Sequence, residues 1–200
     1  MIISENVQGT DGWMKDRVGI PTASNFDKII TTKGVASASA KKYMYQLAGE
    51  RIIGRKEDTY QNAAMQRGTE LEPKARELYE VVTGETVEEV GLCWLDSTKR
   101  VGASPDGLVG EDGDIEIKCP LLPTQVEYLL NKVVPTTYFQ QIQGQLYVTG
   151  RKWCDFVSYY PDMPLLKIRV FRNEVFISAL SRQLDLFCAE LDMIEAKLRG

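Results

Sequence analysis

The chain has 200 residues, of which 44% are hydrophobic and 26% charged, and its net charge is −4 at pH 7. This composition excludes a disordered chain, a collagen-like chain and a generally basic nucleic-acid-binding tail, and the length suits one domain over residues 1–200. The chain contains no histidine. Histidine metal ligands, a Ser-His-Asp triad and a histidine general base are therefore excluded, and hydrolytic chemistry must rest on carboxylates, lysine and a hard metal ion.

Apolar runs and cysteine spacing indicate in which cellular compartment the protein is expected. The apolar runs are too short to cross a bilayer, and residues 1–12 lack the apolar core of a signal peptide. The four cysteines, Cys93, Cys119, Cys154 and Cys188, are far apart and form no CxxC pair. This spacing does not fit a zinc site, an iron–sulfur cluster or a disulfide scaffold. We expect a cytoplasmic protein with buried, reduced thiols and no membrane partner.

The first third of the chain has a helical pattern. Helices are predicted over residues 23–30, 38–54 and 61–82. The third of these stops at Thr83-Gly84, a usual C-terminal signal.

The pattern then changes to short β-rich runs separated by turn residues. Strands are predicted over residues 87–95, 101–109 and 114–119. Glu111-Asp112-Gly113 predicts a hairpin turn between the last two. The remaining predicted elements are helices over residues 124–132 and 136–149, strands over 153–160 and 165–171, and a helix over 173–199. This order predicts a mixed α/β fold, with a mixed sheet flanked by helices.

The residues with the clearest chemistry lie on either side of the hairpin turn. Glu116 and Lys118 are two residues apart on a strand, so their side chains leave the same face of the sheet. Counting from the turn places Asp106 opposite or diagonal to Lys118, with the register open by one residue. Two carboxylates and a backbone carbonyl such as that of Ile117 suit octahedral Mg²⁺. The lysine can orient or deprotonate a water, or neutralise charge on a phosphate.

The same residues also have a plainer interpretation. Asp106-Gly107 is compatible with an ordinary turn, and Glu116 and Lys118 with the solvent-facing side of an amphipathic hairpin. Against this interpretation, the neighbouring isoleucines already supply a buried face. The preceding Ser-Pro pair also fixes Asp106 at a strand entrance, where functional sites are common.

The Ser-Pro-Asp ending at Asp106 and the Glu-Ile-Lys ending at Lys118 resemble the core motif of PD-(D/E)xK nucleases. The chain more narrowly resembles the phage lambda exonuclease family of viral-type recombination exonucleases over roughly residues 11–170. Five segments match in the family's order: residues 13–19, 22–24, 67–72, 116–120 and 141–143.

The resemblance implies a restriction-endonuclease-like fold and a phage or prophage protein of the bacterial cytoplasm. It further implies a Mg²⁺-dependent 5′→3′ exonuclease, with Mn²⁺ as a substitute ion. The enzyme would act on double-stranded DNA with free, preferably 5′-phosphorylated, ends and leave 3′ overhangs for recombination by strand annealing. Two alternatives stay open: a structure-selective or site-specific endonuclease on the same core, and a non-cleaving DNA-end-binding subunit.

The resemblance also assigns roles to individual residues. Asp106 and Glu116 resemble the family's metal-ligating carboxylates, the Ile117 carbonyl a further metal ligand, and Lys118 the catalytic lysine.

Two helical residues resemble further parts of the site. Glu72 resembles the carboxylate that completes the metal site, although the segment from Thr69 to Glu72 is also a capping box. Gln141 resembles a glutamine that could touch the lysine, the water or the scissile phosphate. It shares one helical face with Tyr138 and Gln145, so polar packing of that face is the alternative.

Arg17 resembles the family's anchor for the DNA 5′-phosphate, with Ser24 and Ser104 as neighbouring hydroxyl donors. A guanidinium suits this task because it binds phosphate oxygens through two parallel hydrogen bonds. The alternative is a surface arginine beside Trp13.

Net acidity needs an explanation in a DNA enzyme, because a charge of −4 weakens attraction to the phosphate backbone. Cationic residues crowd the first third of the chain: Lys15, Arg17, Lys28, Lys33, Lys41, Lys42, Arg51, Arg55, Lys56 and Arg67. They are compatible with a basic channel on an acidic body. Family members form ring-shaped trimers around the duplex, so the resemblance also implies a homotrimer, and a single-strand annealing protein as partner.

Overall fold

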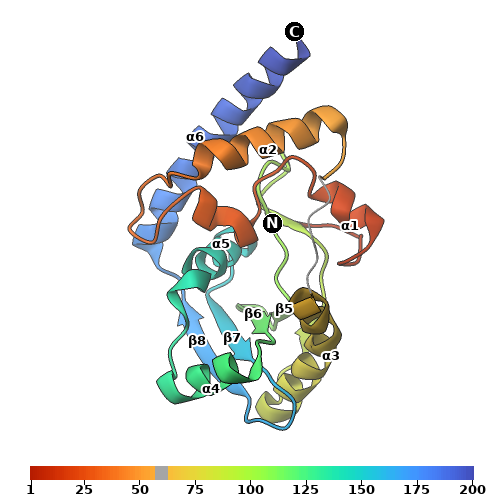
Figure 1. Cartoon of the computed structure of the whole chain (residues 1–200), viewed down its shortest axis with the longest axis vertical. Coiled ribbons are helices and arrows are strands. Elements are labelled where there is room, and N and C mark those ends of the chain that lie inside the picture. Colours follow the sequence, from red (N-terminus) through yellow and green to blue (C-terminus); the bar gives the residue numbers. More distant parts are fainter. Residues whose placement is uncertain (57–62) are drawn as a thin grey trace.

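The computed structural model describes residues 1–56 and 63–200, except for the side chains of residues 63–65. The described residues form two β-sheets, and the strands labelled in Figure 1 belong to the larger one. The larger sheet has the strand order β2-β5-β6-β7-β8 and the smaller one the order β1-β3-β4. The bounds of the larger sheet's strands are β2 Val87–Glu88, β5 Gly107–Val109, β6 Gly113–Lys118, β7 Trp153–Ser158 and β8 Leu166–Phe171. Those of the smaller sheet are β1 Ile2–Ile3, β3 Cys93–Trp94 and β4 Gly102–Ala103.

The predicted mixed α/β fold, with a mixed sheet flanked by helices, is confirmed, and the smaller sheet is an addition that was not predicted. The segments predicted as strands over residues 87–95 and 101–109 each divide between the two sheets. The first divides near Gly91, where a Cβ atom would lie 2.3 Å from the Asn6 carbonyl oxygen of the N-terminal segment. The second divides at Pro105, which has no N–H to continue a ladder of hydrogen bonds.

The predicted hairpin joins β5 to β6. The strands pair antiparallel from Val109 opposite Gly113 to Gly107 opposite Ile115. One residue further, the Asp106 N–H donates to the Ile115 carbonyl at 3.1 Å. Asp106 therefore lies diagonal to Lys118, one of the two positions that the sequence left open.

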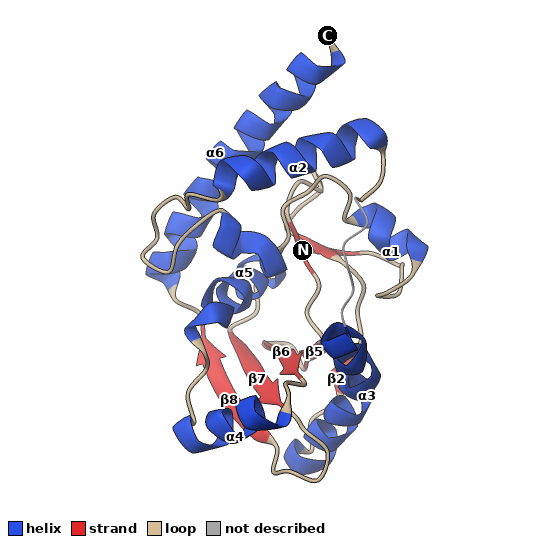
Figure 2. Ribbon diagram, in the orientation of Figure 1, coloured by secondary structure: helices blue, strands red, loops and turns tan. Residues whose placement is uncertain are grey.

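Helices cover both faces of the larger sheet, as Figure 2 shows (helices blue, strands red). Helix α3, Ala63–Thr83, packs on one face, and helix α5, Phe139–Thr149, on the other. Because side chains alternate along a strand, Ile115 and Ile117 of β6 pack toward α3. The opposite face of β6 carries Asp114, Glu116 and Lys118 toward α5. The chain runs from α5 into β7, which pairs parallel with β6.

The remaining helices build the largest hydrophobic core. Helix α2, Ala40–Ile53, packs along α6, Glu174–Arg199, and the 3₁₀ helix η1, Ala23–Lys28, packs against α5. Asn173 caps α6 by accepting the Phe176 N–H at 2.9 Å. The other helices are α1 Asp11–Asp16, α4 Leu122–Asn131 and the 3₁₀ helix η2 Thr136–Tyr138.

The described ends of the predicted helices therefore lie within about two residues of their expected bounds. Helix α1 and strand β1 were not predicted. The helix predicted from residue 61 starts outside the described residues; α3 ends, as expected, before Gly84 with φ +72°. The cysteines are free thiols, with Cys119 only partly buried. Within the described part of the chain, no helix has the length and apolar character needed to cross a membrane.

Candidate active site

The hairpin and the end of β6 bring Asp106, Glu116 and Lys118 together. The Lys118 ammonium is hydrogen-bonded to Glu116 Oε1, as expected for residues two apart on a strand. Asp106 Oδ2 accepts the Ile117 N–H at 2.6 Å, which fixes this carboxylate beside the strand. Glu116 is only 1% exposed, and both faces of β6 are buried. The interpretation of Glu116 as part of a solvent-facing hairpin surface is therefore wrong.

Helix α5 holds the Glu116 carboxylate from the other side. Gln141 Nε2 donates to Glu116 Oε1 at 2.6 Å, and the buried Gln145 donates to Oε2. The spacing of four residues places both glutamines on one helical face. Tyr138 lies at the start of the same face, with its ring centroid 5.2 Å from the Lys118 ammonium. Both glutamines therefore reach the carboxylate, whereas the sequence resemblance singled out only Gln141.

Burial and neighbouring charges shift the pKa values of Asp106 and Lys118. Burial raises the pKa of Asp106 well above its usual value, and the negative charge of Glu116 adds to the rise. Burial opposes the charge of Lys118, but the carboxylates of Glu116 and Asp106 outweigh it and raise the lysine pKa. Lys118 is therefore an ammonium in this arrangement and contributes a positive charge to the site.

Glu72 approaches the cluster from α3. The pKa of Glu72 is raised, chiefly by burial; Arg76 opposes the rise and the negative charge of Glu116 adds to it. Glu72 therefore lies close enough to be affected by the charge of the β6 carboxylate. Its carboxylate is paired with Arg76 at 2.9 Å. The capping-box interpretation is wrong, because α3 begins at Ala63 and Glu72 lies inside the helix.

Arg67 is the residue of the matched Arg-Gly pair that sequence reasoning left without a role. Its Nη1 atom donates to the carbonyls of Cys119 and Pro120, each at 3.0 Å, and its guanidinium lies 4.7 Å from the ring centroid of Tyr160. Arg67 therefore ties α3, which carries Glu72, to the residues that directly follow Lys118.

The donor atoms fit a hard metal ion in kind. The carboxylates of Asp106 and Glu116 and the carbonyl of Ile117 offer oxygen, the element that Mg²⁺ prefers. Over residues 1–56 and 63–200, however, no three or more acidic or cysteine side chains gather into a metal-binding group. Asp106, Glu116 and Ile117 are thus the residues whose oxygen atoms suit such an ion, and Glu72 is paired with Arg76.

A second polar site surrounds Arg17, which is 9% exposed. Its Nη1 atom donates to Ser104 Oγ at 2.9 Å, and its Nη2 atom lies 3.5 Å from the hydroxyls of Thr22 and Ser24. Trp13 donates to the same Ser104 hydroxyl at 3.1 Å and stacks on the guanidinium, 4.3 Å from ring centroid to Cζ.

The arginine beside Trp13 is therefore buried rather than on the surface, and the three residues assigned to the phosphate lie together. Thr22 is an addition that sequence reasoning missed, although it precedes Ser24 by only two residues. Burial lowers the pKa of Arg17, and no carboxylate of the described residues lies within ion-pair distance of it. A buried guanidinium among hydroxyls is a suitable receptor for an anion.

Comparison with known proteins identifies a family. Residues 12–152 match the YqaJ-like viral recombinase domain. The crystal structure of an alkaline exonuclease (LHK-Exo) from Laribacter hongkongensis matches with a TM-score of 0.86 and 41% identity, covering 95% of this chain and 96% of that one. A second crystal structure shows LHK-Exo in complex with dAMP, with the same identity, coverage and TM-score. Curated protein sequences give no match.

A phage-related exonuclease from Haemophilus somnus 129PT shares the fold at 16% identity, with a TM-score of 0.71 over 90% of this chain and 96% of that one. The match over residues 12–152 includes Arg17, Ser104 and the whole β5–β6 hairpin. The chain belongs to the family of YqaJ-like viral recombinase domains and is an enzyme, a nuclease built on the PD-(D/E)xK fold.

Proposed function

We propose that the enzyme is a Mg²⁺-dependent 5′→3′ exonuclease on linear double-stranded DNA. It would prefer 5′-phosphorylated ends and leave 3′ overhangs for phage-type recombination by strand annealing. The observation that carries the proposal is the buried Glu116 carboxylate, held by Lys118, Gln141 and Gln145 beside Asp106. A relative with 41% identity that is an alkaline exonuclease and binds dAMP supports DNA as the substrate.

The residues would divide the work as follows. Asp106, Glu116 and the Ile117 carbonyl would hold Mg²⁺, assisted by Glu72, and the ion supplies Lewis-acid chemistry when bound. The Lys118 ammonium would neutralise charge that develops on the scissile phosphate.

The glutamines keep the Glu116 carboxylate in one orientation and satisfy both of its oxygens, which limits the cost of its burial. Arg17, with Ser104 and Ser24, would bind the 5′-phosphate of the strand being digested. This contact would orient the terminal phosphodiester toward the β6 cluster.

The wider setting is part of the same proposal. We expect a homotrimer around the duplex, a single-strand annealing protein as partner, and action in the cytoplasm of a bacterial host. Encirclement would lessen the need for a high positive charge on a chain whose net charge is −4. Light scattering should give about three times the 22.5 kDa chain mass; a monomer that still digests long DNA processively would contradict the ring.

Digestion of strand-labelled duplexes tests the activity. In Mg²⁺, linear DNA should lose nucleotides from its 5′ ends, faster when these carry a phosphate, while covalently closed circles stay intact. Cleavage of the circles would indicate an endonuclease instead. Binding to ends without any cleavage would indicate the non-cleaving subunit. Ca²⁺ should support binding but little cleavage, because its coordination is longer and looser.

A further inference from the structure

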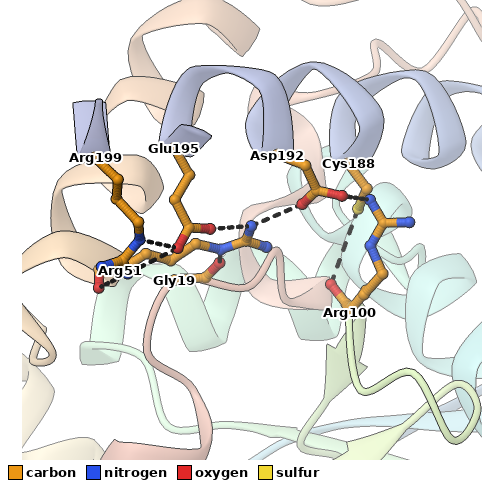
Figure 3. Close-up of polar contacts among 7 residues, drawn as sticks. All are labelled: Gly19, Arg51, Arg100, Cys188, Asp192, Glu195 and Arg199. Carbon is orange, nitrogen blue, oxygen red and sulfur yellow. Dashed lines mark hydrogen bonds and ion pairs between the residues drawn. The ribbon is translucent and has the colours of Figure 1, made fainter. Parts of the chain in front are cut away.

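A polar network connects the C-terminal helix α6 with two distant segments (Figure 3). Arg51 of α2 donates from Nη1 to Asp192 at 2.8 Å and to Glu195 at 3.0 Å. Asp192 also pairs with Arg100, just before β4, and Arg199 donates to Glu195 at 2.9 Å. Asp192 and Glu195 lie beyond residue 152, where the match to the family ends.

One branch of this network reaches the chain reversal after Arg17. Arg51 Nε donates to the Gly19 carbonyl at 2.7 Å, and the Gly19 N–H donates to the buried Glu50 at 3.1 Å. Gly19 has φ +65°, and a Cβ atom there would lie 2.2 Å from Arg51 Cγ. Only glycine therefore fits this tight approach to α2.

The reversal at Gly19 determines where the next residues lie. It brings Thr22 and Ser24 back to the Arg17 guanidinium, each hydroxyl at 3.5 Å. The position of Gly19, held by α2, thus sets one wall of the Arg17 pocket, by which we mean the Arg17 guanidinium with the hydroxyls of Thr22, Ser24 and Ser104.

The other branch reaches the second wall. Arg100 pairs with Asp192 through its side chain, and its carbonyl lies 3.9 Å from the Cys188 thiol of α6. Two residues later, the Gly102 N–H donates to the Pro21 carbonyl at 3.1 Å. The same strand then delivers Ser104 to the Arg17 guanidinium.

From these two branches we infer that Asp192 and Glu195 of α6, acting through Arg51 and Arg100, are positioning residues for the Arg17 pocket. The inference rests on the proposed function, in which this pocket binds the 5′-phosphate. Both segments that flank Arg17 are tied to the same acidic side chain, Asp192, so the placement of their hydroxyls depends on α6.

A purely structural role predicts a different outcome. Asp192 is 50% exposed and Arg100 40% exposed, and ion pairs at such positions contribute little to stability. If these pairs served stability alone, their loss would slow digestion of all substrates alike. A positioning role instead affects only the substrate that uses the pocket.

The experiment compares initial rates on linear duplexes with 5′-phosphoryl and 5′-hydroxyl ends, for the full chain and its variants. Arg51→Ala should lower the phosphoryl-to-hydroxyl rate ratio about tenfold, mainly through KM, because the Gly19 carbonyl loses its side-chain donor and each acid loses one of its two arginine partners. Arg51→Lys should fall in between, since it keeps the charge but loses the planar fork. Asp192→Asn should lower the ratio about threefold. Arg182→Ala is the matched control, because this exposed arginine of α6 donates a hydrogen bond to Ser178 of its own helix and, among the described residues, takes no part in the network of Figure 3.

Arg17→Ala separates this inference from the proposed function. If Arg17→Ala abolishes the rate ratio while Arg51→Ala and Asp192→Asn leave it unchanged, the positioning role is wrong and the phosphate pocket stands. If Arg17→Ala also leaves the ratio unchanged, the pocket is wrong and the inference fails with it. Should Arg51→Ala fail to fold, Asp192→Asn and Glu195→Gln at the helix surface decide by the same ratio.

Discussion

The effect of Asp114 on the pH dependence of stability is the most quantitative test of whether the α5-facing side of β6 is buried. It lies two residues before Glu116 on the same face and is fully buried. Its Oδ2 atom accepts the Thr149 hydroxyl at 3.3 Å, and Oδ1 has no partner among the described residues. Burial raises its pKa from the usual 3.8 to about 7, and the negative charge of Glu116 adds to the rise.

This shift has a definite consequence for stability. The folded chain holds the Asp114 proton more tightly than the unfolded chain, so the free energy of unfolding falls as pH rises from about 4 to about 7 and stays lower above that. A shift of about three pKa units corresponds to about 4 kcal/mol, at 1.36 kcal/mol per unit. Asp114→Asn cannot ionise and removes this contribution.

Urea denaturation at several pH values measures the effect. The free energy of unfolding of Asp114→Asn minus that of the natural chain should increase by about 3–4 kcal/mol from pH 4 to pH 9. The exposed Asp112 of the neighbouring turn, which pairs with Lys152 at the surface, provides the control as Asp112→Asn. That variant should show no such gain. A constant difference between Asp114→Asn and the natural chain across this pH range would refute a buried carboxyl with a raised pKa.

Three further predictions concern activity and metal binding. Arg17→Ala should slow digestion of 5′-phosphorylated ends about 30- to 150-fold and leave 5′-hydroxyl ends nearly unaffected, since a buried charge-assisted contact contributes about 2–3 kcal/mol; equal losses in a rate comparison would place the phosphate pocket elsewhere. Lys118→Ala should abolish cleavage in a nuclease assay while end binding, measured by fluorescence anisotropy in Ca²⁺, persists; retained full activity would overturn its assignment. Gln145→Leu should raise the Mn²⁺ concentration needed for half-saturation in a titration without DNA about tenfold or more, because it frees Glu116 from one of its two glutamines. Unchanged Mn²⁺ binding would leave Gln145 a packing residue.

Periodicity and turn residues predicted most elements because their signals are local. The α2 pattern ends at Gly54, which adopts φ +69°, and the Asp-Gly pair after Glu111 predicted the β5–β6 hairpin. The alternation of Glu116 and Lys118 on one face followed from strand geometry alone. These features need no knowledge of distant contacts.

Features that depend on distant contacts could not be predicted in this way. The division of residues 87–95 between two sheets depends on the N-terminal segment that approaches Gly91. Arg51 illustrates the same limit for charge: its place among the cations of the first third is compatible with a basic channel, yet it is 15% exposed and paired with two acids of α6. Net charge along a sequence does not reveal which side chains are already neutralised.

The two halves of the site are linked by a single short segment. Ser104 contacts the Arg17 guanidinium, and two residues later Asp106 contacts the backbone of β6. Two extended residues span about 7 Å at most, and the intervening Pro105 restricts the backbone further. Under the proposed function, this segment holds the Arg17 site and the β6 cluster at a nearly fixed separation. A strand anchored by its 5′-phosphate would then present the same bond to the cluster in each cycle, which is the geometry that stepwise removal of nucleotides requires.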